Sequence, residues 1–338
     1  MTKAKLNEEG YRAMFENAGV GITRVDLNGV LVDVNQKFCN MLGYTREELF
    51  GMALSTVTHP DDYGQGARFR SQLTQGTARS ATGEKRFLRK DGVIIWARRT
   101  MSIVRDDADN PQYVISIVED ITERKQVEQR QAIEHAITLL LADARSIAEA
   151  LPRVIQIMCD SLGYAYGARW VFDSKESVLR SIESWCAADP AVEEFRRMST
   201  SRVETHGKPG GLNRKVWATI APVWIADVAQ EATLARREAA LRAGLHSAFG
   251  FPILVGGEFY GVMEFFGREV RPRDERVLEI ARTVSTQIGQ FIGRKQAEAA
   301  LRKAHDDLVH KAEELARSND ELQQFAYVAS HDLRSRCA

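Results

Sequence analysis

The chain contains 338 residues, of which 44% are hydrophobic, and its 46 basic and 46 acidic side chains give a formal net charge of zero. This length accommodates two globular domains and linking helices, and the balanced charge leaves no basic excess that would point to nucleic acid or an acidic membrane surface. The longest apolar runs, such as 136–142 and 249–255, are too short to span a bilayer, and the first residues lack the apolar core of a signal peptide, so we expect a cytoplasmic protein.

Residues 10–124 show helix and strand patterns that are bounded by turn signals. Asn28-Gly29 and Asp91-Gly92 are typical of tight turns between strands, and Thr45-Arg-Glu-Glu48 fits a capping box at the start of a helix. We therefore predict an α+β domain with an antiparallel sheet and flanking helices. Its predicted elements are a helix over 11–18, strands over 20–25 and 30–34, a helix over 35–42, and strand segments over 85–90, 93–98, 101–104 and 113–118.

The same residues contain five characteristic motifs. These are Val34–Phe38, Leu42–Leu49, His59–Asp62, Lys90–Gly92 with Trp96, and Asp120–Lys125. In these motifs the segment resembles PAS domains over nearly its whole length. The resemblance implies a small sheet, wrapped by helices, that can enclose a ligand and transmit strain through its terminal helix.

The PAS resemblance identifies no cofactor. Haem-binding members use a histidine on the helix after the His-Pro-Asp-Asp turn, but residues 63–75 contain no histidine, and we interpret His59 as a turn residue. The cysteine motif of the flavin-binding light sensors is also missing, and Cys39 is predicted to face the core. We expect an apolar pocket that is filled by its own side chains or by an unknown small molecule.

Residues 125–137 are predicted to be a linker helix, which is the first part of a longer helical stretch over 126–151. Apolar residues recur along one face of this stretch. Pro152 is predicted to occupy the first turn of the next helix, 153–162, because proline lacks only an amide that would be free there in any case.

Residues 138–294 contain a second α+β pattern. Besides these helices, its predicted elements are strands over 168–172, 178–185 and 222–228, a helix over 236–243, a hairpin of 248–255 and 258–266, and a helix over 273–291. Gly207–Leu212, Val216-Trp217 and the run Ala248–Phe266 resemble a GAF domain. The resemblance implies a second sensor domain in which residues 207–211 form a loop over a pocket. The motifs of bilin-binding and cyclic-nucleotide-binding members are absent, so no ligand is identified.

The four cysteines are scattered, at Cys39, Cys159, Cys186 and Cys337. None belongs to a C-x-x-C pair, and no zinc or iron–sulfur spacing is present, so we predict no metal site. Buried free thiols are favoured over disulfides in a cytosolic chain. A reactive Cys186 is an alternative to a partly buried thiol at a strand end, and the second is favoured.

Leucine recurs every seven residues, at Leu301, Leu308, Leu315 and Leu322. Two helices need such a repeat to supercoil around each other, so residues 295–324 are predicted to form a parallel coiled coil in a homodimer. In one register Asn319 occupies a core position, where a pair of asparagines fixes the register. Alternatively, Asn319 is solvated in a loosely packed stretch.

Residues 325–338 begin with Phe-Ala-Tyr-Val-Ala-Ser-His-Asp-Leu-Arg, which closely resembles the phosphoacceptor box of sensor histidine kinases. In either register of the leucine repeat, His331 falls outside the apolar seam. The resemblance implies that His331 accepts the γ-phosphoryl group of ATP and passes it to an aspartate of a response regulator. Asp332 would orient the imidazole or deprotonate it.

The kinase family continues this box with Pro-Leu, whereas this sequence reads Arg336-Cys337-Ala338 and ends. We therefore expect a PAS–GAF sensor histidine kinase that is truncated inside its dimerisation domain and inactive alone, with ATP acting only through a missing or partner catalytic domain. Two alternatives stay open. One is a non-catalytic sensory dimer that acts on a partner kinase, and the other is a phosphotransfer protein that a partner phosphorylates on His331.

Overall fold

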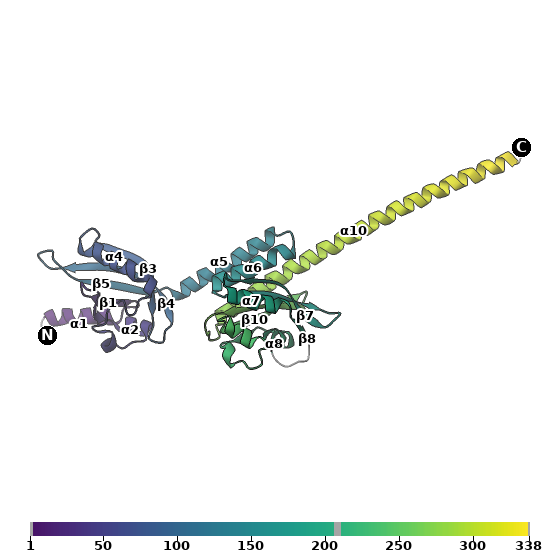
Figure 1. The fold of residues 1–338 in the computed structure, drawn as a ribbon. Coiled ribbons are helices and arrows are strands. Elements are labelled where there is room, and N and C mark those ends of the chain that lie inside the picture. The colour runs from purple at the N-terminus through teal and green to yellow at the C-terminus, as the bar shows by residue number, and fades with distance from the viewer. Residues whose placement is uncertain (1–2, 206–210, 337–338) are drawn as a thin grey trace. The chain divides into compact units, whose positions relative to one another are not determined.

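The computed structural model describes the backbone of residues 3–205 and 211–336 and the side chains of residues 9–205 and 211–323 (Figure 1). The chain divides into two compact units, Met1–Gln129 and Arg130–Ala338. Each unit contains one antiparallel sheet with helices, which confirms the predicted α+β class. The helix α5, Thr122–Asp143, begins in the first unit and ends in the second.

The first unit is built on a five-stranded sheet of order β2-β1-β5-β4-β3 in which neighbouring strands are antiparallel (Figure 1). Its strands are β1 (Gly21–Val25), β2 (Leu31–Val34), β3 (Ser80–Leu88), β4 (Ile94–Arg105) and β5 (Pro111–Asp120). Its helices are α1 (Lys3–Glu16), α2 (Gln36–Leu42), α3 (Arg46–Leu49), the 3₁₀ helix η1 (Pro60–Asp62) and α4 (Tyr63–Thr74).

Turn and cap residues set the ends of these elements. Gly29 has a φ of 94° in the turn before β2, a conformation that glycine adopts without steric cost. The predicted capping box is confirmed, because Thr45 Oγ1 accepts a hydrogen bond from the amide of Glu48 and the Glu48 carboxylate accepts one from the amide of Thr45. Residues 101–104, which were predicted as a separate segment, continue β4 because no turn residue interrupts the strand.

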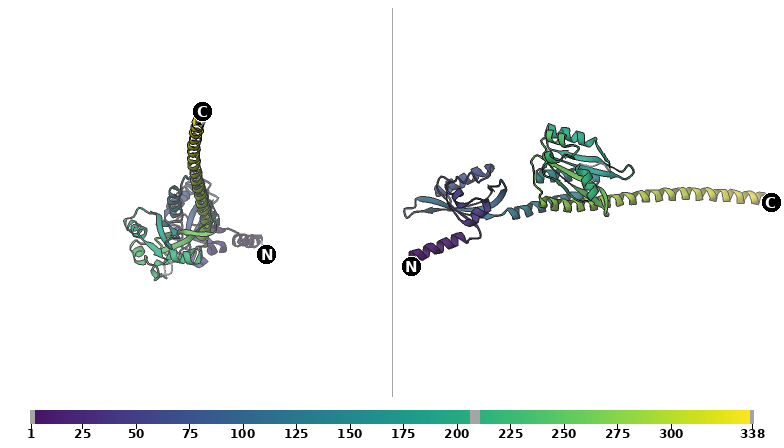
Figure 2. Two further views of the ribbon diagram at one scale, coloured as in Figure 1. Left: turned by 90° about the vertical axis from the view of Figure 1, so that its right-hand side faces the viewer. Right: turned by 90° about the horizontal axis from the view of Figure 1, so that it is seen from below.

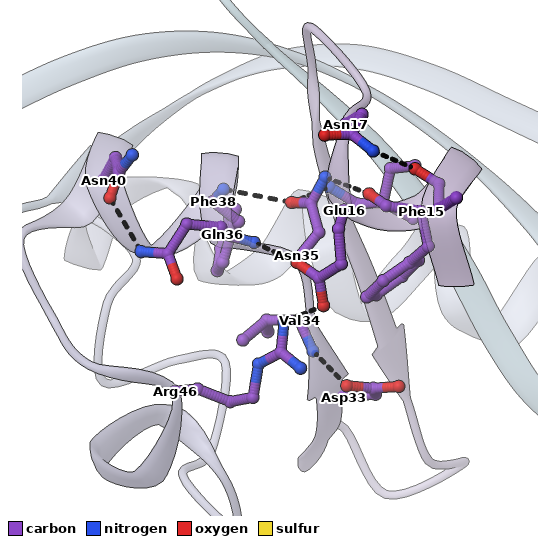
Figure 3. A network of polar contacts seen from close by, with 12 residues as sticks. Phe15, Glu16, Asn17, Asp33, Val34, Asn35, Gln36, Phe38, Asn40 and Arg46 are labelled. Atoms are coloured by element: carbon purple, nitrogen blue, oxygen red, sulfur yellow. Dashed lines mark hydrogen bonds and ion pairs between the residues drawn. The ribbon is translucent and has the colours of Figure 1, made fainter. Parts of the chain in front are cut away.

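Asn35 joins the end of α1 to the sheet and to α2 (Figure 3). Its side-chain oxygen accepts hydrogen bonds from the amides of Ile22 (2.8 Å) and Phe38 (3.1 Å). Its side-chain nitrogen donates to the carbonyl groups of Phe15 (2.9 Å) and Val20 (3.0 Å). These four bonds use the whole hydrogen-bonding capacity of a fully buried amide, so three elements are held in one arrangement.

The second unit is built on a six-stranded antiparallel sheet of order β8-β7-β6-β11-β10-β9. Its strands are β6 (Tyr166–Asp173), β7 (Val178–Cys186), β8 (Val203–Thr205), β9 (Val223–Ile225), β10 (Ser247–Val255) and β11 (Glu258–Gly267). Its other helices are α6 (Ile147–Leu162), α7 (Pro190–Thr200), α8 (Leu212–Thr219), the 3₁₀ helix η2 (Val228–Gln230), α9 (Arg237–Arg242) and α10 (Glu275–Arg336).

Two hydrophobic clusters cover the two faces of this sheet. Phe249 and Phe251 of β10 point into a cluster with α5, α6 and the first part of α10. The neighbouring residue Ala248 points the other way, into a cluster with α7, α8 and α9. This alternation follows from the two-residue period of a strand. The first part of α10 therefore belongs to the core of the second unit, and it runs beside the sheet in Figure 2.

The first helices of the second unit differ from the prediction. The chain leaves α5 after Asp143 and α6 begins at Ile147, so Pro152 lies inside α6 rather than in its first turn. Ser146 caps α6, and its Oγ accepts a hydrogen bond from the amide of Glu149 (3.2 Å). A cap that satisfies free amides, together with the buried face of the helix, outweighs the one hydrogen bond that proline removes.

The last helix, α10, is 62 residues long, which corresponds to about 93 Å at 1.5 Å per residue. Every described side chain from 296 to 323 is exposed. Within the described ranges, no helix combines the length and the apolar character that crossing a membrane requires.

Candidate functional site

The predicted phosphoacceptor residues lie on α10. The backbone is helical through His331 and Asp332, but the side chains of both fall outside the described residues, as does Cys337. The four leucines of the heptad repeat precede them on the same helix and are 64–73% exposed in the single chain. This stripe, which we call the leucine stripe, therefore buries little apolar surface within one copy of the chain.

A cavity of about 220 Å³ lies in the first unit, between the inner face of β3 and β4 and the helix α4. A single water needs about 10–15 Å³, so this cavity has room for a small organic molecule. The charged residues that line it are Asp62, Arg70, Lys85 and Arg99. The expected apolar pocket is apolar only in part, because the lining includes three basic side chains as well as Ala53, Leu54 and Ala67.

Lys85 reaches the cavity from the inner face of β3 and is only 4% exposed. Its Nζ donates a hydrogen bond to Thr58 Oγ1 (2.7 Å) and lies 4.2 Å from the centre of the Phe87 ring. Burial, together with the nearby charge of Arg99, lowers the pKa of Lys85 to about 6. An ammonium group in this place is therefore costly unless an anion joins it.

Arg99 is the diagonal neighbour of Lys85, because Gly83 pairs with Arg99 and Lys85 pairs with Ala97. It is 5% exposed, and burial followed by the charge of Arg70 lowers the pKa of Arg99 to about 10. Among the described residues, neither Lys85 nor Arg99 has a carboxylate within ion-pair distance, although the charge of Asp62 acts on Lys85 from farther away and partly offsets the lowering of the Lys85 pKa.

Asp62 is the one acidic residue of the cavity wall, and its carboxylate is paired with Arg86. The carboxylate accepts hydrogen bonds from the Arg86 backbone amide (2.7 Å) and from Arg86 Nη2 (2.8 Å). These bonds with Arg86 hold the pKa of Asp62 below its usual value. The cavity therefore retains an excess of positive charge from Arg99 and Arg70, and Lys85 adds to this charge only when it is protonated.

A small space that shares Leu54, Gly66, Arg70 and Arg99 with the cavity contains one further polar group. This adjoining space of about 10 Å³ is lined by Arg99 and by Ser116 of β5. Ser116 is 1% exposed, and its hydroxyl has no hydrogen-bond partner among the described residues. Unsatisfied buried hydroxyls are rare in proteins, and a bound water or ligand usually explains them.

The second unit contains a buried ion pair of a different kind. Arg236 donates hydrogen bonds to both oxygens of Glu264 and to Ser199 Oγ (2.9 Å), and the aromatic rings of Trp170 and Phe195 lie 5.3 and 5.5 Å from its guanidinium carbon. Because cation and anion are paired and fully buried, this site has its charge balanced by the protein itself.

Residues 206–210 lie outside the described residues, and they include most of the predicted loop 207–211. Two buried polar side chains lie close to this segment in the sequence. Glu204 is buried, and burial raises the pKa of its carboxyl group. The side-chain amide of Asn213 is fully buried and forms no hydrogen bond that the structure describes.

Three cysteines are described, all as free thiols. Cys39 and Cys159 are buried, as predicted, and Cys186 is partly buried at the end of β7. Burial raises the pKa of all three thiols, and the Glu193 carboxylate, 3.1 Å from Cys186 Sγ, raises that of Cys186 further. A raised pKa leaves little reactive thiolate at neutral pH. No cluster of three potential metal ligands occurs within the described ranges.

Sequence reasoning missed the cationic cavity, although a signal was present. Along β4, the residues Ile95, Ala97 and Met101 face inward, and the two-residue period places Arg99 on the same face. Lys85 holds the corresponding position on β3, two residues before the buried Phe87. A charged residue at an inward position of a strand indicates either an ion pair or a ligand site.

Comparisons with protein families agree with the two-unit division. A PAS domain model matches residues 17–123, and a GAF domain model matches residues 144–293. The cationic cavity lies within the first range, and the buried Arg236–Glu264 pair lies within the second.

Among curated proteins, the chain is 32% identical over 134 residues to the probable diguanylate cyclase DgcE of Escherichia coli (strain K12), a match that covers 39% of the chain and 12% of that protein. It is 24% identical over 185 residues to the sensor histidine kinase TmoS of Ectopseudomonas mendocina, covering 53% of the chain and 19% of that protein. The chain thus spans less than a fifth of the length of either relative.

A solved GAF domain from a phosphoenolpyruvate-protein phosphotransferase of Coxiella burnetii aligns over 51% of the chain and 98% of that domain, with 18% identity and a TM-score of 0.44. The matches to family models and to curated proteins agree on the kind of protein. The chain contains a PAS domain followed by a GAF domain and is homologous to sensor histidine kinases and other sensor proteins.

Proposed function

We propose that this chain is the sensory and dimerisation part of a two-component histidine kinase, with His331 as the phosphoacceptor. The observation that carries the proposal is the leucine stripe, which is exposed on a helix that continues without a break from the GAF core to His331. Exposed apolar side chains at a seven-residue spacing favour a parallel pair of such helices. The predicted division into residues 10–124, 125–137, 138–294, 295–324 and 325–338 belongs to this proposal.

The proposed signal passes along helices. The first turn of α5 is attached to the PAS sheet, because Thr122 Oγ1 accepts a hydrogen bond from the amide of Trp96 (2.9 Å). Further along α5, Ile133 and Ile137 are buried in the GAF core beside Ile288 of α10. A ligand that changes the packing of either domain would shift the population of two arrangements of α10 in the dimer.

At His331, the proposed chemistry is phosphoryl transfer. An imidazole nitrogen forms a bond to the γ-phosphorus of ATP while the bond to the bridging oxygen of ADP breaks. Asp332 is proposed to orient the ring or to accept its proton. The nucleotide would be supplied by the catalytic domain of a histidine kinase, and the phosphoryl group would pass to an aspartate of a response regulator. The cytoplasmic location stays a prediction.

The test is phosphorylation of the full chain with radiolabelled ATP, alone and with a separately supplied catalytic domain of a histidine kinase. We expect acid-labile label only when the catalytic domain is present. The variant His331→Gln should lose the label, and His310→Gln, an exposed histidine on the same helix, should keep it. Label without added kinase, or label that survives His331→Gln, would contradict the proposal.

A dimer that never acquires label with any catalytic domain would instead identify a non-catalytic sensory protein. Light scattering of the same samples reports the dimer independently of phosphorylation.

A further inference from the structure

The cationic cavity of the PAS domain contains buried basic side chains that have no acidic partner within ion-pair distance in the described part of the chain. Lys85 and Arg99 are each at least nine-tenths buried and both line the cavity, but neither has a carboxylate partner among the described residues. The buried pair Arg236–Glu264 in the GAF domain shows the usual arrangement, in which each charge meets its opposite. A buried charge without a partner, such as that of Arg99, costs stability, and a bound anion would also favour the protonated form of Lys85. A domain that places two such basic groups side by side therefore has a reason other than folding.

The backbone leaves room for these cations. A Cβ atom added to Gly29 would lie 2.6 Å from Arg70 Nη1, and one added to Gly66 would lie 3.6 Å from Arg99 Nη2. The turn before β2 therefore accommodates the Arg70 guanidinium at the cavity wall, and α4 passes close over Arg99. The cations thus approach the cavity from α4, β3 and β4.

The other residues that line the cavity indicate which class of ligand would fit it. Ala53, Leu54 and Ala67 provide apolar surface between the charged groups, which suits a short carbon chain. Arginine and lysine side chains bind carboxylates with short, charge-assisted hydrogen bonds. The unpartnered hydroxyl of Ser116, in the small adjoining space, supplies one further donor.

We propose that this cavity binds a small organic dianion, with one carboxylate held between Lys85 and Arg99 and the other facing Arg70. The inference rests on the proposed sensory role of the PAS domain and names the class of its ligand. A bound dianion would neutralise the inner face of β3 and β4 and connect it to α4. Because the full chain can be titrated without phosphoryl transfer, failure of this inference and failure of the His331 proposal are distinguishable.

The test is isothermal titration calorimetry of the full chain with succinate as the probe. Acetate tests a single carboxylate, succinamide tests the neutral shape, and inorganic phosphate tests an anion without a carbon chain. We expect saturable binding of succinate, at least tenfold weaker binding of acetate, and no binding of succinamide. No succinate binding, or phosphate binding tighter than that of every carboxylate tested, would overturn the assignment.

Arg99→Met is the decisive variant, and Arg98→Gln is its matched control. Arg98 is the adjacent residue on the outer face of β4, where it pairs with Glu119. We expect Arg99→Met to abolish succinate binding while raising the melting temperature of the unliganded chain, because it removes an unpaired buried charge. Arg98→Gln should leave both unchanged.

A purely structural Arg99 would give the opposite result. In that case Arg99→Met would lower the melting temperature, and the wild-type chain would show no stabilisation by succinate. Should Arg99→Met fold poorly, Lys85→Met tests succinate binding from the neighbouring strand. We expect it to abolish that binding, and unchanged affinity would overturn the assignment.

Discussion

Glu84 on β3 pairs with Lys125 on α5, with Glu84 Oε2 2.5 Å from Lys125 Nζ. Glu84 also accepts a hydrogen bond from Arg124 of the same helix (2.7 Å). Because side chains alternate along a strand, Glu84 faces the outside while its neighbour Lys85 faces the cavity. One strand therefore contacts both the proposed ligand site and the beginning of the exit helix.

This arrangement predicts that Glu84→Gln leaves succinate binding intact but weakens the effect of that binding on α5. Exposed ion pairs contribute little to stability, so the variant should fold and bind succinate with nearly unchanged affinity. The change that succinate produces in hydrogen exchange of residues 122–129 should be reduced, because the outer attachment of α5 is weakened. The control is Glu119→Gln, which removes the partner of Arg98 and leaves α5 attached. Equal exchange responses in Glu84→Gln and the wild type would exclude this route.

The lowered pKa of Lys85 predicts that the stability of the PAS domain depends on pH. The charged groups that face it are Arg99 from β4, Asp62 from η1 and Arg70 from α4, and its pKa falls from 10.5 to about 6 in the folded domain. Between these two values the unfolded chain binds a proton at Lys85 that the folded domain does not bind. The free energy of unfolding therefore rises with pH in this window, by up to about 1.4 kcal/mol per pH unit.

Calorimetric unfolding of the full chain at pH 6 and pH 8 without ligand tests this prediction (a pH interval of about two units, inside the window). We expect the PAS transition of the wild type to move to higher temperature at the higher pH. Lys85→Met should remove most of that shift, while Lys37→Met, an exposed lysine on α2, should retain it. A wild-type transition that is independent of pH would show that Lys85 keeps its proton when folded.

The cationic cavity and the buried GAF pair also show how far the sequence could predict the molecule. Turn and capping motifs are local, and those at Asn28-Gly29 and Thr45–Glu48 were predicted correctly because few neighbouring atoms decide them. The start of α6 was missed because Ser146 and Glu149 form a cap that competes with the signal from Pro152. Partners distant in sequence decide whether a buried charge is paired, so the difference between Lys85 and Arg236 required the structure.

Two helices of the GAF domain were not predicted at all. The helix α7 is capped by Asp189, whose side chain accepts a hydrogen bond from the amide of Ala191 (2.8 Å), and Pro190 occupies its first turn. These are recognisable start signals. The helix α8 begins after Gly211 without a side-chain cap, and packing of Leu212 and Val216 against the sheet stabilises it. Such tertiary support is invisible to local pattern analysis.

Glu264→Gln should destabilise the GAF domain strongly. Gln preserves the shape of the side chain but leaves the buried guanidinium of Arg236 without a counter-charge, which typically costs about 3–5 kcal/mol. The control is Asp189→Asn at the exposed pair with Arg268, where we expect a much smaller loss because water screens the pair. Asparagine also remains a good N-cap for α7. Denaturant unfolding measures both changes, and similar losses in the two variants would show that burial does not strengthen the Arg236–Glu264 pair.

The leucine stripe predicts a dimer that a single substitution breaks. In a parallel pair of helices each leucine meets its counterpart, so Leu308→Lys removes two buried leucines and places two like charges together. At about 1.5–3 kcal/mol per leucine, the dissociation constant should rise by a factor of about a hundred or more. Glu313→Lys is the control, because position 313 lies outside the seam in both registers and receives the same lysine with an even larger change of charge.

Sedimentation equilibrium of the full chain measures this difference directly. We expect the wild type and Glu313→Lys to be dimers at concentrations at which Leu308→Lys is a monomer. The GAF core is formed by residues that precede Lys295, so the monomeric variant should retain its calorimetric GAF transition. If Leu308→Lys stays dimeric, the seam does not hold the dimer, and the proposal that α10 transmits the signal as a helix pair loses its support.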